Sequence, residues 1–84
     1  MPREKIGSVE HYFTDISVGI IDLDGKLTVG DRIHFIGSTT DFEQTVKSMQ
    51  IDHEDVEEAN RGDVIGMKVK DRVREGDDVL KIVD

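Results

Sequence analysis

Apolar residues that recur at every second position limit the fold of this chain more than any other feature. Ile33 and Phe35 lie two positions apart, and Ile65, Met67 and Val69 repeat that spacing. A period of two places apolar side chains on one face of a β-strand, whereas an amphipathic helix repeats about every 3.6 residues. Strands are therefore expected within residues 7–13, 15–23, 31–37, 44–52, 63–70 and 77–84.

Glycine followed by aspartate opens three of the expected strands, at positions 30–31, 62–63 and 76–77. Glycine accepts the positive φ that tight turns require, and aspartate can bond to nearby backbone amides. Asp24-Gly25 lies between two apolar runs and predicts a hairpin. Arg61-Gly62-Asp63 also matches a short adhesion-receptor motif, but its place in the repeated pattern favours a turn. Positive φ is expected at Gly25, Gly30, Gly62 and Gly76.

Two segments depart from the simple alternation. Val46, Met49 and Ile51 break the period of two, which predicts a bulge or bend near Ser48. Only residues 53–61 could hold a helical turn, and this segment is short. The chain is otherwise predicted to be all-β, a small antiparallel barrel of six or seven strands.

Length and composition exclude several classes of protein. The 84 residues are enough for one small domain, residues 1–84, and there is no cysteine for a disulfide. The N-terminus does not resemble a secretory signal and no apolar run spans a membrane, so a soluble, cytoplasmic chain is expected. Asp52-His53-Glu54-Asp55 matches no metal loop, and no nucleophile motif is present. Neither a metal, a cofactor nor enzymatic activity is expected.

The charge balance disfavours general binding to nucleic acids. Eleven Lys and Arg against 19 Asp and Glu give a net charge of −8, which repels phosphate backbones at long range. Charged residues make up 36% of the chain, which holds one Asn and two Gln. This balance is typical of heat-adapted proteins, which favour ion pairs over thermolabile amides.

Lys68 and Lys70 lie two apart on the outward face of their expected strand, and Arg72 and Arg74 continue the series into the next loop. These four residues are the candidate contact for RNA phosphates or for an acidic partner. Any RNA binding through them is expected to be weak and salt-sensitive. The alternative is a solvated face whose charge is balanced by Asp71, Glu75, Asp77 and Asp78.

The order of the motifs resembles domain 2 of translational GTPases of the elongation factor Tu type. The most specific pieces are GKLTVGDRI at 25–33, TVKSMQ at 45–50 and VEEANRGDVIGM at 56–67, and the resemblance covers residues 5–83. It implies a small antiparallel β-barrel and extends to free-standing archaeal elongation-factor-like proteins of about this length. The phosphate-loop motif of the GTPases is absent, so no GTP binding is expected.

The resemblance implies two alternative functions. In the translation factors this barrel contacts transfer RNA and the ribosome, so the chain is expected to be a non-enzymatic binding module for transfer RNA, the ribosome or a translation factor. A similar barrel closes collagenase-like peptidases at their C-terminus. The alternative is therefore an accessory subunit that docks on a peptidase-like protein.

Overall fold

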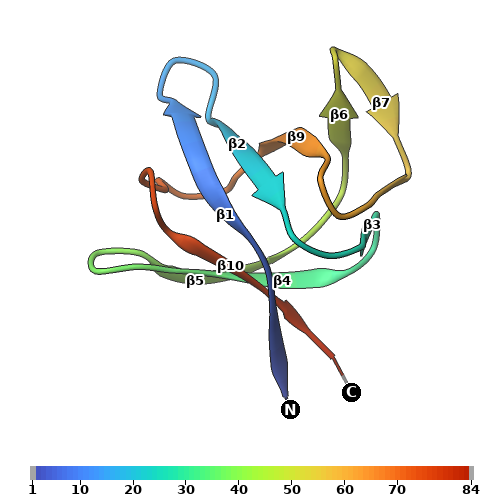
Figure 1. Cartoon of the computed structure of the whole chain (residues 1–84). Helices are drawn as coiled ribbons and strands as arrows, with labels where there is room; N and C mark the ends of the chain where they lie inside the picture. Colours follow the sequence, from blue (N-terminus) through green and yellow to red (C-terminus); the bar gives the residue numbers. More distant parts are fainter. Residues whose placement is uncertain (1, 84) are drawn as a thin grey trace.

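A computed structural model describes residues 2–83, and it is all-β (Figure 1). Residues 1 and 84 are the two ends of the expected domain, and residue 84 also ends the last expected strand. Both lie outside the described residues. No helix occurs between residues 2 and 83, which confirms the predicted fold class. The ten strands are β1 (Arg3–Phe13), β2 (Val18–Leu23), β3 (Leu27–Thr28), β4 (Arg32–Ile36), β5 (Asp41–Thr45), β6 (Met49–Ile51), β7 (Glu54–Val56), β8 (Glu58–Ala59), β9 (Val64–Lys68) and β10 (Asp78–Ile82).

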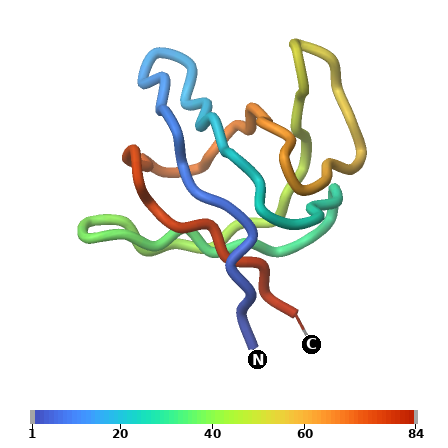
Figure 2. The backbone as a smooth tube through the Cα atoms, viewed as in Figure 1, coloured from blue at the N-terminus to red at the C-terminus, as the bar shows by residue number. Residues whose placement is uncertain are grey.

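Eight strands form one antiparallel sheet in the order β5-β4-β10-β1-β2-β9-β6-β7, and β3 pairs with β8 in a second, two-stranded ladder. The strand count exceeds the expected six or seven because residues 41–59 form four short strands and because Leu27–Thr28 forms the additional strand β3. The sheet curls strongly, so that β5 at one edge comes round to face the end of β9 (Figure 1). The termini leave on the same side (Figure 2), where Val83 N donates to Pro2 O at 3.0 Å.

The core lies inside this curl and follows the alternation seen in the sequence. Ile33, Phe35, Ile65 and Met67 are buried, as the period of two predicts. The break near Ser48 is also present: residues 46–48 are irregular and connect the edge strand β5 to β6, the strand next to the opposite edge. The other buried apolar residues are Ile6, Val9, Ile21, Leu23, Leu27, Val46, Met49, Ala59, Val69, Val73 and Val79.

The three Gly-Asp turns share one hydrogen-bonding pattern. In the turn at 60–63, Asp63 N donates to Asn60 O at 3.0 Å, and Asn60 N donates to the Asp63 carboxylate at 2.8 Å. Gly62 takes a φ of 91°, which suits the third position of a type II turn. The turns at 28–31 and 74–77 repeat both bonds, with φ of 100° at Gly30 and 89° at Gly76. The Arg-Gly-Asp tripeptide is therefore part of a structural turn.

The prediction for Asp24-Gly25 is wrong. Gly25 is not at positive φ, and Asp24-Gly25 does not form a hairpin, because β2 pairs with β1 and β9 while β3 pairs with β8. Asp24 N instead donates to Ile6 O at 2.6 Å. Residues 53–61, the segment that could hold a helical turn, contain β7 and β8 instead. The tight hairpin lies at Asp52-His53, which join β6 to β7 with φ of 52° and 66°.

Candidate docking surface

The four cationic residues predicted as a contact are all exposed, but the fold divides them between two hollows. Lys68 and Lys70 line a groove of about 590 Å³, whereas Arg72 and Arg74 line a separate hollow of about 230 Å³ beside residues 39–42. The predicted stripe is therefore two surfaces. The binding role of these residues stays a prediction.

The groove lies where β5 faces residues 68–70, a place that we call the seam. Segments distant in sequence contribute to this seam groove, because the curl of the sheet brings its edge strand beside the end of β9. Its charged and amide side chains are Arg32, Glu43, Gln44, Lys47, Lys68 and Lys70. Four cations against one carboxylate leave a balance of +3 in a chain whose net charge is −8.

Gln44 closes the seam with its side chain. Gln44 Nε2 donates to Lys68 O at 3.1 Å, and Lys70 N donates to Gln44 Oε1 at 2.9 Å. One amide group thus supplies the donor and the acceptor that a neighbouring strand would otherwise provide. No backbone ladder joins β5 to β9 among the described residues. The seam is consequently held by a side chain along a free strand edge.

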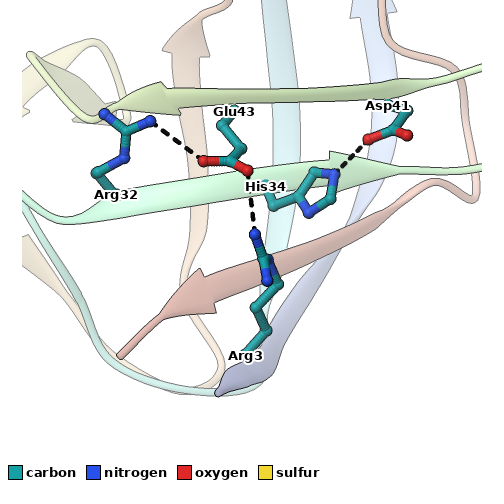
Figure 3. Close-up of polar contacts among 5 residues, drawn as sticks. All are labelled: Arg3, Arg32, His34, Asp41 and Glu43. Carbon is teal, nitrogen blue, oxygen red and sulfur yellow. Dashed lines mark hydrogen bonds and ion pairs between the residues drawn. The ribbon is translucent and has the colours of Figure 1, made fainter. Parts of the chain in front are cut away.

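Glu43 occupies the outer face of β5 between two arginines (Figure 3). Arg32 lies 3.1 Å and Arg3 3.0 Å from its carboxylate oxygens. Hydrogen bonds from Arg32 and then from Arg3 hold the pKa of the Glu43 carboxyl below its usual range. Glu43 is therefore satisfied by its own neighbours and leaves the lysines of the groove unpaired.

His34 and Asp41 form a second polar pair on the same face (Figure 3). His34 Nε2 lies 2.5 Å from Asp41 Oδ1, while the buried Nδ1 of the same ring has no partner among the described residues. The pair links β4 to β5 beside the Glu43 cluster. It supports the hairpin that carries one wall of the seam groove.

A second exposed feature is the tip of the β1–β2 hairpin. Phe13 is 44% exposed and Ile16 is 60% exposed. The His11 ring packs edge-on against Phe13 with centroids 4.5 Å apart, which holds the aromatic ring in place. Large apolar side chains exposed together on a protruding hairpin are typical of protein contacts.

Sequence reasoning identified Lys68 and Lys70 but missed Arg32, Gln44 and Lys47. These residues lie more than 20 positions away in the chain, and only the curl of the sheet brings them to the seam. Within residues 2–83 no group of three or more His, Cys, Asp and Glu side chains could hold a metal ion. No helix in this part of the chain is long and apolar enough to cross a membrane.

The chain belongs to the elongation factor Tu domain 2 family, whose model matches residues 18–77. This confirms the resemblance drawn from the sequence motifs. The match begins at β2 and ends at the third Gly-Asp turn, so it includes every residue that lines the seam groove.

The chain is also similar to proteins named as peptidases. It is 47% identical over 76 residues to an uncharacterized protease of Methanocaldococcus jannaschii, covering 89% of this chain and 19% of the relative. The C-terminal domain of a putative U32 peptidase from Geobacillus thermoleovorans superposes with a TM-score of 0.89 at 18% identity, covering 95% of this chain and 93% of that domain. A selenomethionine variant of the domain superposes with a TM-score of 0.86 at 18% identity, covering 90% and 96%.

These similarities favour one of the two expected functions. The chain spans about a fifth of the curated relative. At 18% identity the solved domains show the same fold and no more. The relatives named as a protease or peptidase are consistent with the peptidase-associated alternative, and none of the similarities supports a role at transfer RNA or the ribosome.

Proposed function

We propose that this chain is a non-enzymatic docking domain that works with the catalytic part of a U32-type peptidase. The observation that carries the proposal is its 47% identity to a segment that makes up 19% of an archaeal protein named as a protease. Function is carried by particular sites rather than by a fold, so the docking role rests on the exposed surfaces of this domain.

The exposed tip of the β1–β2 hairpin supports the proposal. Phe13 and Ile16 present apolar surface to a partner, and apolar anchors of this kind provide much of the energy of protein contacts. We therefore assign the contact with the peptidase to this tip, and the seam groove remains open for a further ligand.

The test is association with the archaeal relative from which the matching segment has been removed. Isothermal titration calorimetry should detect binding of this chain to that truncated protease. Phe13→Ser/Ile16→Ser should abolish the heat of binding. Val64→Ser is the matched control, because Val64 is also 44% exposed. It lies at the start of β9, whereas the hairpin tip is next to Lys68 at the end of β9. Absence of binding by the wild-type chain to a folded truncated protease would overturn the proposal.

A translational role is the second candidate function, and the observation behind it is the group of unpaired lysines in the seam groove, Lys47, Lys68 and Lys70. Contact with transfer RNA would use the lysines of the seam, against a net charge of −8. A titration with transfer RNA by fluorescence anisotropy at two salt concentrations tests it. Binding that falls with added salt and is lost in Lys68→Glu/Lys70→Glu would favour this function over peptidase docking.

The composition supports two further proposals: that residues 1–84 form one domain, and that it works in the cytoplasm of a heat-adapted cell. The absence of cysteine and the 36% of charged residues are the features behind them. A midpoint of thermal unfolding above about 90 °C would mark the domain as hyperstable. An ordinary midpoint near about 55 °C would contradict heat adaptation.

A further inference from the structure

Unpaired cations gather at the seam. Of the eleven Lys and Arg residues, five form an ion pair within 4.0 Å among the described residues: Arg3, Lys5, Lys26, Arg32 and Lys81. Lys47, Lys68 and Lys70 belong to the other six, and all three line the seam groove. Four of the seven cations outside the groove form ion pairs, whereas three of the four cations in the groove form none among the described residues.

The groove also borders a strand edge with free backbone groups. Gly37 N donates to Thr40 O and Val46 N donates to Asp31 O, each at 2.8 Å. In an antiparallel ladder, residue pairs that exchange hydrogen bonds alternate with pairs that do not. Given these two bonds and the β4–β5 register, Glu43 and Thr45 belong to the pairs that do not, so their backbone groups point away from β4. Such an edge can accept an extended peptide.

We propose that the seam groove binds an extended, acidic segment of a protein partner. Its carboxylates would pair with Lys47, Lys68 and Lys70, and its backbone would lie along the free edge of β5 at Glu43 and Thr45. The proposal rests on the proposed function in taking the partner to be a protein, and it adds a second contact beside the hairpin tip.

Charge and size favour a peptide over RNA. The groove has a balance of +3 and a volume of about 590 Å³, which suits a few residues of peptide. The residues outside the groove carry the excess of carboxylates that makes the chain −8. Charges are screened beyond about 10 Å at 0.1 M salt, so a short acidic segment experiences the groove while a long polyanion also meets the acidic surroundings. Free backbone groups add a recognition element that only a polypeptide uses in this way.

The test uses a fluorescein-labelled peptide of alternating aspartate and threonine, with an asparagine–threonine peptide as the neutral probe. Fluorescence anisotropy should show binding of the aspartate peptide only, weakening as salt is added. Lys68→Glu/Lys70→Glu should lower its affinity by about tenfold or more, since two ion pairs become two repulsions. Arg72→Glu/Arg74→Glu is the matched control, because it changes the net charge equally in a different hollow. It should lower affinity by less than about threefold.

Several results would overturn the proposal. They are absence of aspartate-peptide binding by the folded wild type at low salt, equal losses in the two charge variants, and unchanged binding in Lys68→Glu/Lys70→Glu. Transfer RNA that competes the peptide off and binds more tightly would assign the groove to RNA instead. Circular dichroism and thermal melts establish that each variant is folded.

The same variants separate this proposal from the proposed function. If Lys68→Glu/Lys70→Glu loses the peptide but still binds the truncated protease, the groove and the hairpin tip are independent contacts, as proposed. If the wild type binds the protease but not the peptide, the groove proposal fails and the docking function stands. If it binds the peptide but not the protease, the docking function fails and the groove proposal stands for another protein partner.

Discussion

The two sides of the curled sheet are held together by different chemistry. Across β10-β1-β2-β9, backbone ladders run for several residues in each pair. At the seam, β5 meets residues 68–70 through the single amide of Gln44. A ladder uses up the backbone groups of both strands, whereas a side-chain closure leaves a strand edge and its lysines accessible. The continuous side is therefore joined by backbone ladders, and the seam is the place where the proposed binding surface lies.

The largest expected effect is on the continuous side. Ile21→Ala removes a fully buried side chain from β2 and should lower the free energy of unfolding by about 2–5 kcal/mol. Ile20→Ala, one residue away on the half-buried outer face, is the control and should cost clearly less. Chemical denaturation of both variants checks this, and equal losses would mean that the two faces of β2 are assigned incorrectly.

A substitution at the seam should have a smaller but measurable effect on the free energy of unfolding. Gln44→Ala removes two hydrogen bonds, which should lower the free energy of unfolding by about 1–2 kcal/mol. Hydrogen exchange at the Lys70 amide should accelerate, because that N–H loses its acceptor. Gln50→Ala is the control, since Gln50 bonds only to the exposed Asp55 at the opposite edge. An unchanged Lys70 amide in Gln44→Ala would show that the seam is closed by other contacts.

Alanine in the Gly-Asp turns should lower the stability equally at the seam and on the continuous side of the sheet. Gly30 bonds to Val46 near the seam, and Gly62 bonds to Leu23 at the end of β2. Alanine at either position must keep a positive φ and should cost on the order of 1 kcal/mol. Gly25→Ala should cost less, because its added Cβ would only touch Ile6 at 3.4 Å. Thermal melts in which Gly25→Ala is the most destabilised variant would contradict this reading.

The smallest expected effect concerns the Glu43 cluster beside the seam. The pKa of the Glu43 carboxyl is lowered in the folded state. The ionised carboxyl therefore stabilises the fold above the unfolded pKa of about 4.3, and this stabilisation is lost as pH falls through the folded pKa. Glu43→Gln should melt slightly below wild type at neutral pH, and the difference should shrink as the pH falls below about 4.3, the usual pKa of a glutamate. A difference that persists in acid would indicate that the loss is one of packing rather than of charge.

Much of the fold could be predicted because its signals are local. The alternation identified the buried faces around Phe35 and Met67, and the repeated Gly-Asp pairs identified three turns. The predicted position of the tight hairpin was wrong because that prediction also used only local sequence. Asp24-Gly25 has the preferred turn sequence, yet Asp24 bonds to Ile6 in a distant strand, while Asp52-His53 takes positive φ without glycine. Asp and His are among the residues most often found in that conformation, but the signal is weak.

The candidate site could be predicted only in part. Lys68 and Lys70 were evident because a strand places alternate residues on one face. Their grouping with Arg72 and Arg74 depended on neighbours in sequence, and the fold separates those residues into another hollow.

The sequence by itself determined the all-β class, the family and the repeated turns, because strand alternation and turn chemistry act over two to four residues. Only the tertiary structure decided that Gln44 closes the seam and that Lys47 joins Lys68 and Lys70. Those contacts depend on how far the sheet curls, which is set by the packing of the whole core around Phe35 and Ile65. No local pattern records that curvature, because it is the sum of many small twists between neighbouring strands.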